Sequence, residues 1–141
     1  MKNVSIIYGS TTGNTERVAQ LLKENIKDCT VTVSNVTDAS NEMIEADIVL
    51  FGSSTWGYGE LQDDFASYYD NMGNLPLSGK SVAVFGCGDS ASFGEMFCEA
   101  VNLIESKLEE CGANLICDSL KVDGDVDENI SEIEEFAKSI G

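Results

Sequence analysis

The chain has 141 residues, 43% of them hydrophobic, and carries 25 acidic against 8 basic residues for a formal net charge of −17 at pH 7. That length predicts one domain, residues 1–141, and the apolar content with a single proline excludes a disordered chain. The charge argues against nucleic acid as a partner and favours the basic surfaces of other proteins, although acidity can also serve solubility alone.

The N-terminus and the cysteines bear on localisation and metal binding. The first apolar run begins directly after Met1-Lys2-Asn3, which leaves no room for a signal peptide, and no apolar stretch is long enough to span a bilayer. Five cysteines, at positions 29, 87, 98, 111 and 117, form no CxxC pair, and the chain has no histidine. We therefore expect a cytoplasmic protein with reduced thiols and no metal site.

Short β-branched runs alternate with helical periodicity, which is typical of a parallel sheet covered by helices. Five strands are expected, at residues 3–8, 30–34, 47–52, 81–86 and 114–122, the last broken by Asp118-Ser119. Helices are expected from residue 16, around 65–72, near 96–111 with Gly112 as C-cap, and near 126–140, with a short helix around 41–45. Their periodicity predicts buried faces of Val18, Leu21, Leu22 and Ile26; Phe65, Tyr68, Tyr69 and Met72; Val101, Ile104 and Leu108; and Ile130, Ile133, Phe136 and Ala137.

The turn between the first strand and the first helix has the composition of a phosphate-binding loop. Residues 9–15 read Gly-Ser-Thr-Thr-Gly-Asn-Thr. Two glycines and several hydroxyl and amide side chains allow backbone N–H groups to converge on an oxyanion at a helix N-terminus. The spacing differs from GxxxxGK[ST] and the loop has no lysine, so it suits a single terminal phosphate rather than a triphosphate with magnesium. A hydroxyl-rich helix cap is the alternative interpretation.

Two further loops carry aromatic residues. A doubly wound sheet binds ligands beyond the carboxyl ends of its strands, so the loops after the third and fourth strands matter most. Residues 53–60 read Ser-Ser-Thr-Trp-Gly-Tyr-Gly-Glu and contain the only tryptophan of the chain, Trp56. Residues 86–98 contain Phe93 beside a glycine. Together they predict two aromatic walls around a planar ring, with a tryptophan buried under its own loop as the alternative.

These three loops, in this order, closely resemble those of the flavodoxins, and the resemblance spans the whole chain. It rests on Thr-Thr-Gly-Asn-Thr at 11–15, Ser-Thr-Trp-Gly at 54–57 followed by residues 60–65, and Gly-Cys-Gly-Asp-Ser at 86–90. The resemblance implies an α/β flavodoxin-like three-layer sandwich, with a five-stranded parallel sheet of order 2-1-3-4-5 and helices on both faces. The fifth strand, taken as uninterrupted, resembles that of the short-chain group.

The resemblance also implies a function and a cofactor. It identifies the chain as a low-potential one-electron carrier, not an enzyme, whose non-covalently bound FMN cycles between semiquinone and hydroquinone while it shuttles electrons between redox enzymes. By the same resemblance, the FMN phosphate lies on Ser10, Thr11, Thr12, Gly13, Asn14 and Thr15, with Ser54 closing the site.

The flavin ring would lie between Trp56 and Phe93, which stands where the family usually has tyrosine. The backbone of Asp89 and Cys98 would donate to the flavin O2 edge, and Met96 would accept from N3–H. Gly57 would turn its carbonyl toward N5 on reduction. The remaining predicted cofactor-binding residues are Ser53, Thr55, Tyr58, Cys87, Gly88 and Phe97. The stretch 91–95 aligns with the family in more than one register.

Two other functions fit the expected fold less well. A phosphoacceptor domain would need an acidic pair after the first strand and an aspartate after the third, where the chain has Phe51-Gly52-Ser53. A flavodoxin-like FMN-dependent quinone reductase is the closer alternative, but no histidine is available as a general acid or base. For a monomeric carrier, the acids expected nearest the flavin would lower its potential and would meet basic redox partners transiently: Glu60, Asp63, Asp64, Asp89 and Glu95.

Overall fold

The computed structural model describes residues 2–9, 14–27, 29–38, 41–56, 60–61, 63–72, 77–88, 99–123 and 126–140. Its centre is a parallel sheet of β2 (Cys29–Asn35), β1 (Lys2–Gly9), β3 (Ile48–Trp56) and β5 (Ser81–Gly88), in that order. Two short strands, β6 (Asn114–Leu115) and β7 (Leu120–Asp123), both pair with β5 in parallel and share the fifth position. The predicted order 2-1-3-4-5 is thereby confirmed.

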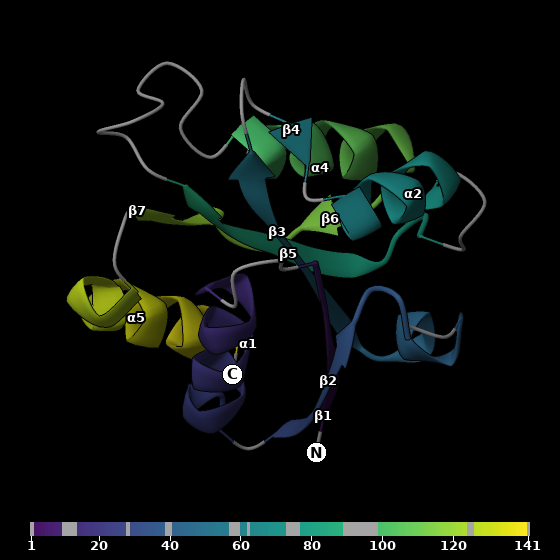
Figure 1. Cartoon of the computed structure of the whole chain (residues 1–141). Helices are drawn as coiled ribbons and strands as arrows, with labels where there is room; N and C mark the ends of the chain where they lie inside the picture. Colours follow the sequence, from purple (N-terminus) through teal and green to yellow (C-terminus); the bar gives the residue numbers. More distant parts are fainter. Residues whose placement is uncertain are drawn as a thin grey trace.

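Helices cover both faces of this sheet (Figure 1). One face packs against α1 (Asn14–Asn25) and α5 (Ile130–Ile140), and the other against α2 (Asp63–Asn71) and α4 (Glu99–Glu110). Each face has its own buried apolar cluster, because the central strands alternate their side chains between the two layers. No helix among the described residues is long and apolar enough to cross a membrane.

The expected buried faces of the helices are largely confirmed. Val18, Leu22 and Ile26 lie in the core below the sheet, and α4 buries Val101, Ile104 and Leu108 above it. Four residues that were expected to be buried are only half-buried: Leu21, Tyr68 and Tyr69, which still pack against the two clusters, and Ile130, which opens α5 directly after the 3₁₀ turn η4 (Val126–Asn129). The short helix expected around 41–45 is also present, as the 3₁₀ helix η1 (Asn41–Glu45).

The end of α4 is capped as the sequence indicates. Gly112 has a φ of 79°, its N–H donates to the Glu109 carbonyl at 3.0 Å, and the N–H of Ala113 donates to the Leu108 carbonyl at 3.0 Å. This pair of bonds is the Schellman pattern, in which a residue with left-handed backbone stops the helix. The cap then directs the chain into β6 at the edge of the sheet.

Two strands differ from the expectation by more than two residues. The third strand was expected to end at residue 52 and be followed by a loop, but β3 continues to Trp56 and pairs antiparallel with β4 (Glu60–Leu61). Thr55 and Trp56 have high strand propensity, and the hairpin partner satisfies their backbone groups. The fifth strand is interrupted across residues 116–119, a gap that includes the predicted Asp118-Ser119 break and corrects the expectation of an uninterrupted strand.

Candidate functional site at the carboxyl edge of the sheet

The carboxyl ends of β1, β3 and β5 lie side by side at one edge of the sheet. Gly9 pairs with Ser53, which in turn pairs with Gly86, and Ser54 pairs with Cys87. The helix α1 begins at Asn14, five residues after the end of β1. All three predicted loops therefore leave the sheet at the same edge, as expected for a ligand site in a doubly wound fold.

Glycine allows the three strands to approach closely just before this edge. A Cβ atom on Gly52 would lie 2.2 Å from Cζ of Phe85, whose ring fills the space beside that glycine. A Cβ atom on Gly86 would lie 2.6 Å from the carbonyl oxygen of Ser53 and 2.5 Å from Cγ2 of Val101. Both contacts are shorter than side chains tolerate, so the positions of the loop origins depend on these glycines.

A side-chain hydrogen bond joins the first loop region to the fourth core strand. Thr15 in the first turn of α1 is fully buried, and its hydroxyl bonds to the Cys87 thiol near the end of β5. Burial raises the pKa of Cys87 to about 11, although the bond from Thr15 acts in the opposite direction. Cys87 is therefore a neutral thiol that contributes packing and a hydrogen bond rather than reactivity.

A second contact holds the same helix turn from the side of β1. The Tyr8 hydroxyl makes side-chain hydrogen bonds to Glu16 in α1 and to Asn35 at the end of β2. Burial, followed by the charge of Glu16, raises the pKa of Tyr8 above its ordinary value. The sequence predicted Tyr8 only as the end of a strand, although the hydroxyl of a tyrosine on a buried strand face needs a hydrogen-bond partner.

The N-terminus of α1 is suited to an anion that is held without a lysine or arginine side chain. The first N–H groups of a helix have no acceptor within the helix, and they carry the positive end of its dipole. Arg17 is the only cation in the first turn of α1, and its guanidinium pairs with Asp127 in η4. The backbone N–H groups at the start of the helix are therefore the donors for a terminal phosphate in the described part of the chain, and such donors fit the phosphate of FMN.

The structure brings part of the predicted site together. Asn14 and Thr15 open α1, Ser53 is buried at the edge, and residues 54–56 continue β3. Cys87 and Gly88 end β5, paired with Val122 and Asp123 of β7. The other predicted site residues lie outside the described part of the chain: Ser10, Thr11, Thr12, Gly13, Gly57, Tyr58, Asp89, Phe93, Met96, Phe97 and Cys98.

Comparison with known proteins agrees with the fold. Residues 6–136 match the family described as Flavodoxin. A flavodoxin of Maridesulfovibrio salexigens is 53% identical over 131 residues, which cover 89% of this chain and 88% of that protein.

Two solved structures show the same architecture. A short-chain flavodoxin associated with a PDU bacterial microcompartment superimposes with a TM-score of 0.90 at 26% identity, covering 99% of this chain and 96% of its own. The Fusobacterium nucleatum flavodoxin, solved bound to flavin mononucleotide, gives a TM-score of 0.88 at 18% identity, with coverages of 99% and 97%, which shows the shared fold alone. With its family match, its close relative and its sheet order, the chain belongs to the flavodoxin family.

Proposed function

We propose that this flavodoxin holds FMN non-covalently at the carboxyl ends of β1, β3 and β5. As a flavodoxin, the chain is an FMN-dependent electron carrier rather than an enzyme. The observation that carries the proposed location is the convergence of three strand ends beside the N-terminus of α1. The bound flavin supplies the one-electron chemistry, and the protein binds, orients and shields it.

Within this site, the phosphate lies against residues 10–15 and is held by backbone N–H groups and hydroxyls at the start of α1. The hairpin of β3 and β4 carries Trp56 to one side of the ring, and the loop after β5 carries Phe93 to the other. In this proposal, the backbone carbonyl of Gly57 turns toward N5 of the flavin ring when the ring is reduced. The Thr15–Cys87 bond supports this arrangement because it fixes the start of α1 against β5.

The partners that we propose are basic surfaces of redox proteins, met in transient encounters by a monomer. Nine acidic residues and no basic one occur between residues 28 and 79, a segment that includes both strands of the β3–β4 hairpin. Such a surface accelerates encounter with a basic partner and makes the rate sensitive to salt. We also propose that the protein is a single domain of residues 1–141 and that it works in the cytoplasm. The thiols of Cys29, Cys87, Cys111 and Cys117 are free, which is consistent with a reducing compartment.

The test is a visible absorption spectrum of the purified protein followed through stepwise anaerobic reduction. A flavin spectrum with a distinct half-reduced stage is expected, whereas a protein that neither contains nor takes up FMN would overturn the site. Ser10→Ala should weaken FMN binding by roughly ten-fold or more, because it removes a charge-assisted hydrogen bond. Ser139→Ala is the matched control, since Ser139 is exposed on α5 and its hydroxyl donates to the Glu135 carbonyl within the same helix. Steady oxidation of NADH by a quinone would instead favour the reductase alternative.

A further inference from the structure

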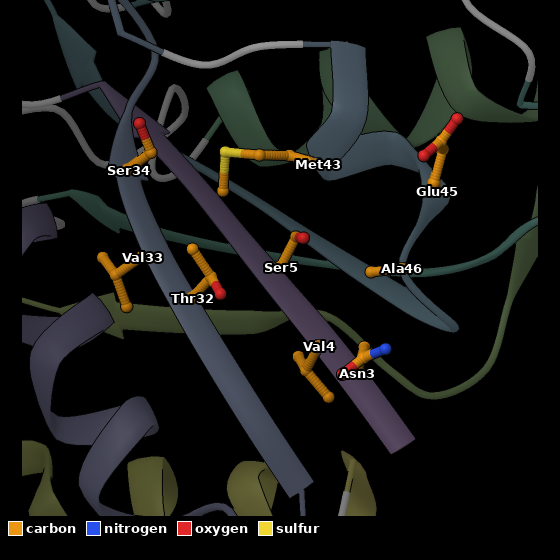
Figure 2. Close-up of a pocket in the computed structure, with 9 residues that line it drawn as sticks. All are labelled: Asn3, Val4, Ser5, Thr32, Val33, Ser34, Met43, Glu45 and Ala46. Carbon is orange, nitrogen blue, oxygen red and sulfur yellow. The ribbon is translucent and has the colours of Figure 1, made fainter. Parts of the chain in front are cut away.

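A polar pocket lies on the sheet, away from the proposed flavin site. It is formed by β1 and β2 with the η1 segment at one end, and its volume is about 730 Å³ (Figure 2). We call it the β1–β2 pocket, and its walls comprise Asn3, Val4, Ser5, Thr32, Val33, Ser34, Met43, Glu45 and Ala46. Ser5 is four residues before the end of β1, which separates it from the carboxyl edge by about 13 Å of strand.

The alternation of side chains explains why this part of the sheet is polar and open. On one face, Val31 and Val33 of β2 pack against the cluster below the sheet. On the opposite face, the register places Ser5 beside Thr32, and Asn3 beside Thr30. Thr30 and Thr32 are exposed, so this side of the edge strand is accessible to a ligand.

Ser5 is the feature that points to a ligand. Its side chain is only 4% exposed and lines the pocket, beneath Met43 and beside Ala46 (Figure 2). Among the described residues, none provides a hydrogen-bond partner for its hydroxyl. The structure contains no fully buried side-chain oxygen or nitrogen without a partner among its described residues, so the Ser5 hydroxyl is reached from the pocket and is available to water or to a bound polar group.

The charges around the pocket favour a cation. Glu45 is exposed at the η1 end of the pocket and forms no ion pair with any described residue. Neither nearby lysine lines the pocket: the Lys80 ammonium donates to the Ala46 carbonyl at 2.9 Å, and Lys2 lies on the opposite face by strand alternation. Asp47 adds a further carboxylate, which accepts from the Asn3 N–H at 2.8 Å.

We propose that the β1–β2 pocket binds an alkylammonium group, supplied by a free polyamine or by a lysine side chain of another protein. An ammonium offers three donors and no acceptor, which suits the hydroxyl oxygens of Ser5 and Thr32 on the neighbouring strands. The Glu45 carboxylate at the η1 end of the pocket supplies a negative charge that attracts the cation. The thioether of Met43 and the methyl group of Ala46 contact the alkyl stem, in the way that lysine stems pack on apolar surface. The inference does not depend on where FMN binds.

The test follows backbone amide NMR shifts of the FMN-loaded protein during titration with 1,4-diaminobutane, and separately with N-acetyl-lysine methylamide. Saturable shifts centred on residues 3–5, 32–34 and 43–46 are expected with at least one probe. A response to the diamine alone identifies a free polyamine as the source, and an equal response to the lysine amide identifies a protein side chain. The neutral analogue 1,4-butanediol should cause no saturable shift.

Variants separate this site from general attraction to an acidic protein. Glu45→Gln should weaken the diamine affinity by roughly five-fold, whereas Glu134→Gln, which removes the same charge from the exposed side of α5, should leave it nearly unchanged. Ser5→Ala should also weaken binding, and an unchanged flavin spectrum shows that the variant is folded. Shifts spread over all acidic surfaces, or equal losses in Glu45→Gln and Glu134→Gln, would overturn the proposal.

Discussion

The contact between Gly52 and Phe85 provides a quantitative test of how the strand ends are positioned. In Gly52→Ala the new Cβ would lie 2.2 to 2.7 Å from three atoms of the Phe85 ring, which is fully buried. Normal carbon contacts are about 3.5 to 4 Å, so the ring must move by more than roughly 1 Å in a close-packed core. Overpacking of this kind destabilises by about 1 to 3 kcal/mol, and we expect the upper end of that range. For a chain of this length, about 3 kcal/mol corresponds to a fall of roughly 10 °C in Tm.

The substitution Phe85→Leu tests whether the loss in Gly52→Ala comes from the contact with the Phe85 ring. Phe85→Leu alone leaves a partly filled cavity and should destabilise by about 1 to 2 kcal/mol. In the double variant, the methyl group introduced at position 52 fills part of the space that the ring vacates, so the combined loss should be smaller than the sum by about 1.5 kcal/mol. Urea unfolding of the apoprotein, followed by far-UV circular dichroism, measures all four free energies without the contribution of FMN binding. If the two losses add to within about 0.5 kcal/mol, the glycine is not there to accommodate the ring.

Three further predictions concern single interactions. Burial raises the pKa of the Cys87 thiol to about 11, whereas the unfolded thiol has its ordinary pKa of 9.0, so the free energy of unfolding should fall between about pH 9 and 11. Cys87→Ala should make that fall shallower, which is checked by measuring the free energy of unfolding of both proteins across this pH range. Gly112→Ala should destabilise by roughly 1 to 2 kcal/mol, because the left-handed φ of 79° is unfavourable for alanine, and a thermal melt with an unchanged Tm would contradict the cap. Arg17→Ala should change the unfolding free energy by less than about 1 kcal/mol, since the side chains of Arg17 and Asp127 are 55% and 63% exposed. A larger loss in urea unfolding would show that this ion pair stabilises the fold more than an exposed ion pair does.

The sheet could be predicted from the sequence because its strands are buried on both faces. Such strands are nearly continuous apolar runs, and 47–52 and 81–86 stand out between segments of helical period. Gly112 was similarly informative, because a glycine after a helical period indicates a left-handed cap. The order of the strands, however, came from the resemblance to flavodoxins, since local periodicity carries no information about which strands are neighbours.

The missed features depend on which segments pair or pack against one another. The apolar run at 47–52 predicted that the strand ends at residue 52, whereas β3 extends to Trp56 because the nearby β4 supplies a partner strand. The Thr15–Cys87 hydrogen bond joins residues that are 72 positions apart, and neither local sequence indicates it. The β1–β2 pocket was missed for the same reason, since hydroxyls on a strand face look like ordinary surface until the neighbouring strand is placed.

The start of α1 is fixed from three sides by three consecutive residues. Thr15 bonds to Cys87 in β5, Glu16 bonds to the tyrosine hydroxyl near the end of β1, and Arg17 pairs with Asp127 in η4. A phosphate approaching a protein with a net charge of −17 is repelled at long range, although salt screens this repulsion beyond about 10 Å. The attraction that holds the anion must then come from N–H groups within the first helical turn, whose effect is short-ranged and depends on exact placement. Fixing that turn before the anion arrives reduces the ordering cost of binding, so the proposed phosphate site at the start of α1 does not need a basic side chain.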